Sequence, residues 1–390
     1  MKITVPTLLL DKEKCLRNIR LMVEKARRNG LRLRPHFKTH QSAQVGEWFR
    51  QEGVEAITVS SVRMARYFAN HGWTDIMVAI PVNVLELETI NELASRVRLH
   101  LIVVNEEVVP ILQKGLNHKV AVWLKIDTGY HRTGIPATNY KTIDNALQTI
   151  AATDKLEFQG FMAHDGHTYK QTDAEAIRAI HQTTVDHLNQ LLERYKGQFQ
   201  TIELSIGDTP SCSILETIVG VDEIRPGNFV FYDLTQQHIG SNTYNQIAVC
   251  MACPVIAKHS ERNEIILYGG SVHFSKDVLS QSDGSNLFGR VVAMTGNGWT
   301  DPVEGINLVS LSQEHGILKA TDEQFANYSI GDIMYILPIH SCLTADSMKS
   351  YLTLEGERLE HLAGLPESYL QFPRPHSVWR TCECLTSEII

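Results

Sequence analysis

The sequence predicts an α/β protein, namely a (β/α)8 TIM barrel followed by a second, C-terminal all-β domain. Eight short apolar runs alternate with segments whose apolar residues recur at helical spacing, which is the pattern of parallel strands joined by helical crossovers. Past residue 240 the segments become short, alternating and separated by Gly, Asn and Asp. We therefore expect a barrel over residues 8–240 and a β-rich domain over residues 241–390, which also includes residues 1–7.

The expected barrel strands are apolar runs bounded by polar or turn-forming residues. They cover residues 31–36, 56–60, 75–80, 98–104, 120–127, 157–164, 201–206 and 223–232. The expected helices cover residues 12–29, 41–52, 62–70, 84–95, 106–116, 140–151 and 173–196. An open, doubly wound sheet is the alternative, but it would usually carry a glycine-rich dinucleotide turn after its first strand, and this sequence has none there. In the second domain we expect strands over residues 246–257, 264–273, 307–312 and 332–343.

Composition restricts the class of protein. The chain has 390 residues, 43% of them hydrophobic and 21% charged, which is typical of a soluble globular protein. Its net charge of −8 and the lack of a basic cluster argue against a nucleic-acid partner. The seven scattered cysteines fit a reducing cytoplasm better than a disulfide framework, and no apolar run is long enough to span a membrane.

One lysine lies at the end of the first expected strand. If the strand pattern continues through the following loop, His36, Lys38 and His40 share one face. A lysine that is partly desolvated and flanked by other cationic groups has a lowered pKa and forms Schiff bases. The alternative is a loop lysine beside two solvated histidines, and the local sequence by itself favours that alternative.

The residues at the other strand ends favour the interpretation of Lys38 as a Schiff-base lysine, because several of them can bind a ligand or transfer protons. The fifth strand is followed by a loop with two glycines and Arg132, and the sixth is followed by His167 and Tyr169. In TIM barrels, the loops after strands seven and eight commonly bind phosphate. In this sequence those loops contain Ser205, Gly207, Asp208, Thr209, Arg225, Gly227 and Asn228. An amine nucleophile opposite a phosphate cradle indicates pyridoxal 5′-phosphate.

A second chemical motif lies in the strand-like run 332–343. His340 and Cys342 are two residues apart, so a strand would place both side chains on one face. Imidazole and thiolate are zinc ligands, and a pair is too few for a closed structural site, so substrate oxygens would have room to bind. The alternative is a buried thiol beside a hydrogen-bonded histidine. Asp346 is either a third ligand, a group that supports the ligands, or a carboxylate at the surface.

Over nearly its whole length the chain resembles the metal-activated branch of the alanine-racemase-fold (fold type III) pyridoxal-phosphate enzymes. That branch contains D-serine dehydratases, D-threonine aldolases and enzymes acting on 3-hydroxy-D-aspartate. The resemblance is carried by residues 6–11, 34–40, 127–134 and 225–227 and by the His340-Ser341-Cys342 motif. It implies two cofactors, pyridoxal 5′-phosphate and Zn²⁺, a small-molecule D-amino acid substrate, and a cytoplasmic homodimer without a nucleic-acid or membrane partner.

The resemblance also implies roles for individual residues. Lys38 matches the lysine that holds the cofactor and acts as a base, and Arg132 matches the arginine that contacts the phenolic oxygen. Arg225 matches the position facing the pyridine nitrogen, and Tyr169 lies near an active-site tyrosine. The expected catalytic residues are Lys38, His167 and Tyr169, and the expected metal ligands are His340 and Cys342. The expected cofactor-binding residues are Lys38, Arg132, Tyr169, Ser205, Gly207, Asp208, Thr209, Arg225, Gly227 and Asn228.

The expected function is a lyase acting on β-hydroxy-D-amino acids, with D-serine dehydratase, which forms pyruvate and ammonia, as the first choice. The alternatives are a D-threonine aldolase or a 3-hydroxy-D-aspartate aldolase or dehydratase, in which His167 is a candidate base. A racemase is less favoured, because residues 269–273 end in His273 where racemases carry a tyrosine base. A non-catalytic pyridoxal-phosphate carrier would not need the metal motif. Among the remaining histidines, His100 is expected at the surface or at a helix cap.

Overall fold

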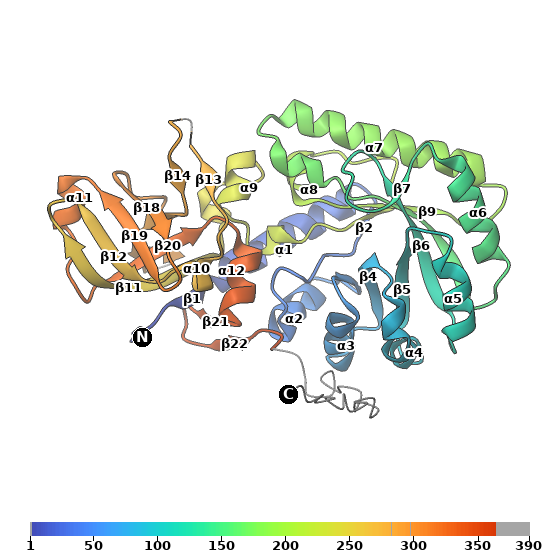
Figure 1. The fold of residues 1–390 in the computed structure, drawn as a ribbon, viewed down its shortest axis with the longest axis horizontal. Helices are drawn as coiled ribbons and strands as arrows, with labels where there is room; N and C mark the ends of the chain where they lie inside the picture. The colour runs from blue at the N-terminus through green and yellow to red at the C-terminus, as the bar shows by residue number, and fades with distance from the viewer. Residues whose placement is uncertain (1, 282, 297, 364–390) are drawn as a thin grey trace, which may run out of the picture.

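The computed structural model describes residues 2–281, 283–296 and 298–363. Parts of the expected second domain, namely Met1 and residues 282, 297 and 364–390, lie outside the described residues. The described chain forms a barrel of parallel strands wrapped by helices, and beside it a second unit of antiparallel strands (Figure 1).

Eight parallel strands form the barrel, as predicted. Their order is β3-β4-β5-β6-β8-β9-β10-β2, and the short strand β7 (Ile135–Pro136) pairs beside β6. A parallel bridge between His36 and Thr58 closes the ring, with Phe37 N–H donating to the Thr58 carbonyl at 2.8 Å. The eight strands are β2 (Arg32–Leu33), β3 (Ala56–Val59), β4 (Asp75–Pro81), β5 (Arg98–Val103), β6 (Val120–Asp127), β8 (Leu156–Met162), β9 (Glu203–Ile206) and β10 (Glu223–Ile224).

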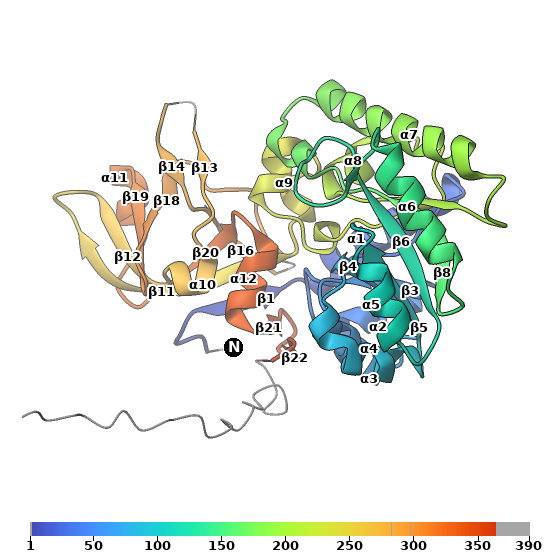
Figure 2. The ribbon, with the colours of Figure 1, turned by 45° about the vertical axis from the view of Figure 1, so that its right-hand side comes forward.

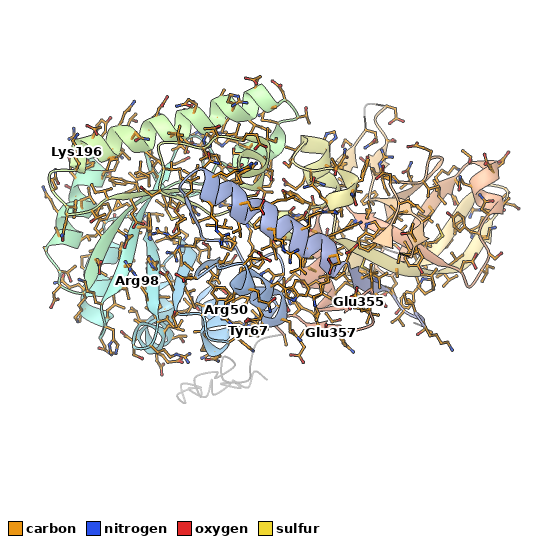
Figure 3. The ribbon with its side chains drawn as sticks, turned by 180° about the vertical axis from the view of Figure 1, so that it is seen from behind. Arg50, Tyr67, Arg98, Lys196, Glu355 and Glu357 are labelled. Carbon is orange, nitrogen blue, oxygen red and sulfur yellow. The ribbon has the colours of Figure 1, made fainter. Side chains whose placement is uncertain are left out.

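Helices cover the outside of the barrel, and side chains cap most of their N-termini. Ser42, Ser61 and Asn139 each accept a backbone N–H from the first turn of the helix that follows, which contributes about 1 kcal/mol each. Figure 3 shows α1 crossing the back of the molecule between the barrel and the second unit. The helices are α1 (Lys12–Arg28), α2 (Ala43–Gln51), α3 (Val62–Asn70), α4 (Leu87–Ala94), α5 (Val108–Gly115), α6 (Tyr140–Ala151), α7 (Ala174–Tyr195), α8 (Thr209–Ile214) and α9 (Leu234–Ile239), with short 3-10 turns η1 (Val84–Glu86), η2 (Gly166–Lys170), η3 (Asn228–Val230) and η4 (Tyr244–Gln246).

Two barrel strands are much shorter than expected. The run 31–36 is a strand only over Arg32–Leu33, because Pro35 has no N–H to donate to a neighbouring strand. The run 223–232 ends as a strand at Ile224, where Pro226 has the same effect, and a 3-10 turn follows at Asn228–Val230. Both corrections turn predicted strand residues into loop residues at the end of the barrel.

The second unit is an antiparallel sheet that closes on itself. Strands β11, β12, β19, β18, β15 and β20 pair in a ring, since β12 also pairs with β11, and β1, β21 and β22 extend the sheet from β11. Its strands are β1 (Thr7–Leu10), β11 (Val249–His259), β12 (Glu264–Tyr268), β15 (Gly289–Val292), β18 (Ile306–Leu311), β19 (His315–Ala320), β20 (Ile333–Pro338), β21 (Ser350–Thr353) and β22 (Arg358–Glu360). Two hairpins project from it, β13 (Leu279–Ser280) with β14 (Asn286–Leu287) and β16 (Met294–Thr295) with β17 (Gly298–Trp299). Three short helices complete it, α10 (Ser271–Phe274), α11 (Asp322–Ala326) and α12 (Ser341–Met348).

Three details differ from the expected second domain. Residues 8–10, expected at the start of the barrel, pair in the second sheet, antiparallel with β11 and parallel with β21. The expected strands 264–273 and 332–343 end early, at Tyr268 and Pro338, and helices α10 and α12 replace their last residues. Figure 1 and Figure 2 both show α12 at the junction between the barrel and the second sheet, which is where the His340-Ser341-Cys342 motif lies.

Inside the barrel, the expectation that His100 lies at the surface is wrong. The His100 side chain is buried in the barrel interior, and both of its ring nitrogens have a polar neighbour there. Trp123 Nε1 donates to Nδ1 at 3.0 Å, and Nε2 lies 3.0 Å from Asp75 Oδ1. None of the described helices is both long enough and apolar enough to cross a membrane.

Candidate active site

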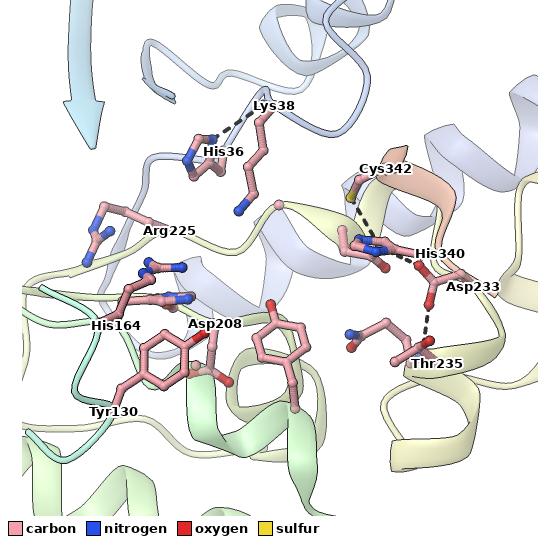
Figure 4. A pocket seen from close by; sticks show the side chains of 17 residues that line it. His36, Lys38, Tyr130, His164, Asp208, Arg225, Asp233, Thr235, His340 and Cys342 are labelled. Atoms are coloured by element: carbon pink, nitrogen blue, oxygen red, sulfur yellow. Dashed lines mark hydrogen bonds between the residues drawn. The ribbon is translucent and has the colours of Figure 1, made fainter. Parts of the chain in front are cut away.

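A cavity of about 240 Å³ opens at the carboxyl ends of the barrel strands, where the barrel meets α9 and α12 (Figure 4). From the predicted set it brings together Lys38, Arg132, Tyr169, Gly207, Asp208, Arg225, Gly227, Asn228, His340 and Cys342. His167, Ser205 and Thr209 do not line it. The residues that the sequence reasoning did not assign to the site are His36, Tyr130, His164, Gly166, Asp233, Thr235 and Gln236.

Lys38 lies two residues beyond the bridge that closes the barrel, and its side chain points into the cavity (Figure 4). Its Nζ makes no hydrogen bond or ion pair with another described residue. Desolvation in the cavity lowers the pKa of Lys38 below its ordinary value; the charge of Cys342 opposes this shift and the charge of Arg132 adds to it. A lowered pKa increases the neutral fraction of the amine, which is the form that acts as nucleophile and base.

Two histidines beside Lys38 are neutral. Burial, followed by the charge of Lys38, holds the pKa of both His36 and His164 well below the ordinary value. His164 uses its Nδ1–H to donate to the Gly207 carbonyl, so the loop after β9 fixes this imidazole. The two rings therefore shape the cavity wall without adding charge to it.

The prediction that His40 shares the face of His36 and Lys38 is wrong. Residues after His36 form a turn, so the strand alternation stops there. The His40 side chain is completely buried, 5.7 Å from the Phe49 ring and 4.4 Å from the Phe37 ring between centroids. His40 thus packs in the core behind the cavity wall.

Arg225 forms the floor of the cavity, and Ser205 lies directly beneath it. Arg225 Nε donates to Ser205 Oγ at 2.7 Å, and Ser205 Oγ donates to Glu223 Oε1 at 2.7 Å. Burial lowers the pKa of Arg225 to about 10, so the guanidinium is charged at neutral pH. Ser205 was predicted to bind the cofactor, but here it reaches the cavity only through Arg225.

The loops after β9 and β10 pack against the cavity so closely that they require glycine. A Cβ at Gly207 would lie 2.8 Å from the Arg225 Cβ, and a Cβ at Gly227 would lie 2.9 Å from the His36 Cβ. Thr209 is buried behind Tyr169, whose hydroxyl accepts the Thr209 N–H at 3.1 Å. The Thr209 backbone is therefore not part of the cavity wall.

Asp208 contributes a carboxylate to the same loop. Its Oδ1 accepts the Ser211 N–H at 2.7 Å and the Thr168 hydroxyl at 3.0 Å, which caps α8, while Oδ2 is buried without a partner among the described residues. Burial, followed by the charge of Asp165, raises the pKa of Asp208 to about 7. This rise favours the neutral form of Asp208, which repels an anionic group in this loop less than a carboxylate does.

His340 and Cys342 lie at the other end of the cavity, and the strand predicted for them is absent from the described chain. His340 is the residue before α12 and Cys342 is in the first helical turn. His340 Nδ1 lies 3.0 Å from Asp277 Oδ2, which leaves Nε2 directed elsewhere. Burial opposes the charged forms of both side chains. For His340 the hydrogen bonds to Asp277 and to Cys342 outweigh this effect of burial, and for Cys342 the hydrogen bond to His340 outweighs it. The pKa of His340 is raised to about 11 and the pKa of Cys342 is lowered.

The donor chemistry of this pair fits a zinc ion, since a thiolate and an imidazole oriented through its other nitrogen are both zinc ligands. Among the described residues, no group of three or more His, Cys, Asp or Glu side chains converges as a metal site. Asp346 instead pairs with Lys349 at 2.7 Å and accepts from Gln41 Nε2 at 3.0 Å. It lies outside the cavity wall, in agreement with the interpretation as a surface carboxylate.

Pyridoxal phosphate likewise fits the unpartnered amine of Lys38, the Arg225 guanidinium and the close-packed glycine loops.

His167 lies outside the cavity wall, with its ring stacked on Tyr130 at 6.2 Å between centroids. Asp233 is one of the cavity residues that the sequence analysis did not assign, although its role as a helix cap could have been predicted. An Asp followed by Leu-Thr-Gln-Gln is typical of a helix start, and Asp233 caps α9.

Comparison with known proteins agrees with this geometry. Residues 10–234 match the family model described as "Alanine racemase, N-terminal domain", and residues 248–354 match the model described as "Putative serine dehydratase domain". The D-serine dehydratase of Dictyostelium discoideum is 29% identical over 365 residues, covering 86% of this chain and 89% of that protein.

Solved structures are similar as well. The D-threo-3-hydroxyaspartate dehydratase of Delftia sp. HT23 superposes with a TM-score of 0.86 at 27% identity, covering 93% of this chain and 99% of that chain. A cysteine-to-alanine mutant of that dehydratase, described as the metal-free form, superposes with the same TM-score, identity and coverage. The chain therefore belongs to the alanine racemase N-terminal domain family, with a serine dehydratase-type domain following the barrel.

Proposed function

We propose that this protein is a pyridoxal-phosphate- and zinc-dependent lyase that converts D-serine to pyruvate and ammonia. The observation that carries the proposal is one cavity with an unpartnered amine, Lys38, at one end and the His340–Cys342 pair at the other. The similarity to proteins named D-serine dehydratase and D-threo-3-hydroxyaspartate dehydratase supports it.

When bound, pyridoxal phosphate supplies an electron sink for a carbanion at the substrate Cα, and zinc supplies a Lewis acid for the β-hydroxyl. Lys38 would hold the cofactor, and, as the resemblance implies, Arg225 and Arg132 would contact its pyridine nitrogen and its phenolic oxygen. The loops at Gly207 and Gly227 receive the phosphate. His340 and Cys342 hold the zinc ion at the end of the cavity away from Arg225.

The chain's own residues account for the proton movement. Lys38, with its lowered pKa, takes the proton from the substrate Cα on its side of the cavity. Hydroxide is a poor leaving group, which is why the β-hydroxyl must lie toward His340 and Cys342. The neutral rings of His36 and His164 keep the wall uncharged around Lys38.

A single lysine base favours action on one enantiomer, and the similarity to proteins named D-serine dehydratase and D-threo-3-hydroxyaspartate dehydratase selects the D-configuration. His273, in the segment where racemases have a tyrosine, does not line the cavity, and its Nδ1 accepts the Gly270 N–H at 3.1 Å. The racemase-type base from the second domain is therefore missing from the cavity wall in the described part of this chain. D-amino acids, and not L-amino acids, are the proposed substrates.

A cytoplasmic homodimer is also proposed, following the resemblance. The exposed apolar side chains of Val272, Val278 and Leu343 lie on and next to α10 and α12, beside the His340 end of the cavity.

Dehydration of 3-hydroxy-D-aspartate is the second candidate, favoured by the similarity to the Delftia dehydratase. It uses the same elimination of a β-hydroxyl. Retro-aldol cleavage is less favoured, since His167, its candidate base, lies outside the cavity wall.

The experiment is to incubate the purified protein with pyridoxal phosphate and zinc and with D-serine, L-serine, D-threo-3-hydroxyaspartate or D-threonine. We expect a 2-oxo acid and ammonia from D-serine and no glycine or aldehyde from D-threonine. A chelator should lower D-serine turnover by roughly a thousandfold and β-chloro-D-alanine turnover far less, because chloride leaves without a Lewis acid. Equal loss on both substrates would contradict the proposed role of the metal.

A further inference from the structure

A buried carboxylate, Asp233, connects the candidate metal site to the candidate cofactor loop. The Asp233 side chain is 1% exposed, and its Oδ2 accepts three hydrogen bonds. The donors are Ser341 N–H at 2.9 Å, Ser341 Oγ at 3.2 Å and Asn228 Nδ2 at 2.6 Å. Its Oδ1 accepts the Gln236 N–H at 2.9 Å, which caps α9.

Ser341 is the residue between the two candidate zinc ligands. Its side chain is fully buried, and both its N–H and its hydroxyl are bonded to Asp233. A displacement of Ser341 would move His340 and Cys342 together, because each is joined to it by one peptide bond. Asp233 therefore sets the position of the pair relative to the barrel.

Asn228 carries the connection on to the loops after β9 and β10. Its backbone N–H donates to Thr209 Oγ1 at 3.2 Å, and its Nδ2 also contacts Ser341 Oγ at 3.1 Å and Cys342 Sγ at 3.4 Å. The orientation of the Asn228 amide is fixed, since a carboxylate such as Asp233 can only accept from the NH₂ group. An unbroken set of buried hydrogen bonds thus runs from Thr209 to the thiol of Cys342.

We infer that Asp233, Asn228 and Ser341 form a clamp that couples zinc binding to pyridoxal-phosphate binding. The inference rests on the proposed function. A cofactor that orders the loop at Gly227–Asn228 places Asn228, and through Asp233 it preorganises His340 and Cys342 for the metal. Zinc, by fixing His340 and Cys342, preorganises the cofactor loop in return, and thermodynamic linkage requires the two effects to be equal.

The test measures two pairs of dissociation constants on the full-length protein. The zinc constant is measured by competition with a chromophoric chelator, with and without bound pyridoxal phosphate. The pyridoxal-phosphate constant is measured by absorbance, with and without zinc. We expect each ligand to tighten the other by the same factor, roughly 5- to 150-fold.

Asp233→Asn should lower this factor toward one, because an amide has a single acceptor oxygen, so its NH₂ faces either the Gln236 N–H or the donors of Ser341 and Asn228, and the negative charge that holds them is gone. Asn228→Ala is the second variant, and it breaks the clamp without placing a donor against donors. Thr344→Val is the matched control. Thr344 Oγ1 on α12 contacts the Phe274 carbonyl at 2.9 Å and the His340 carbonyl at 3.0 Å, but none of Asp233, Asn228 and Ser341, so this variant can change the zinc constant itself and should keep the wild-type factor.

The results separate the inference from the proposed function. Tightening by a common factor in the wild type, lost in Asp233→Asn and Asn228→Ala and kept in Thr344→Val, supports the clamp. A wild-type protein that binds both ligands with independent constants overturns it, and so does an unchanged factor in both clamp variants. A protein that binds neither ligand overturns the proposed function as well.

Discussion

Two groups of charged side chains lie at opposite ends of the barrel strands, one buried and the other on exposed loop residues that line the cavity. At the amino ends the charges are matched. Glu223 accepts from Arg32 at 2.6 Å and from Arg34 at 2.7 Å, and Arg34 also pairs with Asp75. At the carboxyl ends, Lys38 and Arg132 have no carboxylate partner among the described residues.

The difference teaches which end serves stability and which end serves binding. A buried ion pair with all its partners is tolerated, and removing one member is costly. Unpartnered cations inside a cavity destabilise the protein, so they persist where an anionic ligand supplies the missing charge. The two groups are linked through Arg225, which contacts Glu223 by way of Ser205.

The largest expected effect is on catalysis, at the carboxyl ends of the barrel strands, where Lys38 has no carboxylate partner in the described part of the chain. Lys38→Ala should lower D-serine turnover by about a thousandfold or more, while the cofactor-free protein unfolds at about the same or a higher urea concentration, because the lost amine has no partner among the described residues. Turnover, urea unfolding and mass-spectrometric mapping of the borohydride-reduced cofactor adduct check this. An adduct on a different lysine would show that the cavity is not oriented as proposed.

At the paired end the expected effect is on stability. Glu223→Gln should lower the free energy of unfolding by about 3–5 kcal/mol, because Arg34, 1% exposed, loses its buried carboxylate. Glu157→Gln is the matched control, since Glu157 pairs with Lys119 at 3.4 Å on the exposed surface and should cost less than about 1 kcal/mol. Similar losses in the two variants would mean that burial does not distinguish these pairs.

The pH dependence sharpens the same comparison. Burial raises the pKa of Glu223, but Arg34 and Arg32 outweigh it and lower the pKa from 4.5 to about 2. The pKa of Glu223 is lower in the folded than in the unfolded protein. The stabilisation that ionised Glu223 gives to the folded protein is therefore complete above pH 4.5 and is lost as the pH falls toward 2. The stability gap between wild type and Glu223→Gln should therefore shrink over that window in urea titrations. A gap that is constant with pH would contradict the ion pair.

The smallest expected effect is at His167, which stacks on Tyr130 outside the cavity wall. His167→Asn should change kcat/KM for D-serine by no more than about twofold, or about 0.4 kcal/mol. Steady-state kinetics check this, with D-threonine as the second substrate. A loss above about tenfold, or 1.4 kcal/mol, would place His167 among the reacting groups and favour the retro-aldol alternative.

Much of the barrel could be predicted because its signals are local. Apolar runs and turn residues located all eight strands, and β6 was predicted over its full length, Val120–Asp127. The loops that carry Lys38, Arg132, Arg225 and Gly227 follow from strand positions alone, since carboxyl ends of parallel strands meet at one face. Strand ends were less predictable where Pro35 and Pro226 stopped the backbone pairing.

The sequence by itself determined the repeating strand–helix pattern and the residue types that converge on the cavity, because period and turn chemistry act between near neighbours in the chain. Only the tertiary structure decided which of those residues face the cavity. Ser205 and Thr209 lie behind its wall, His40 packs among aromatic rings, and Asp233 contacts Ser341 from more than a hundred residues away. These outcomes depend on packing and hydrogen bonds between distant segments, which no local pattern encodes.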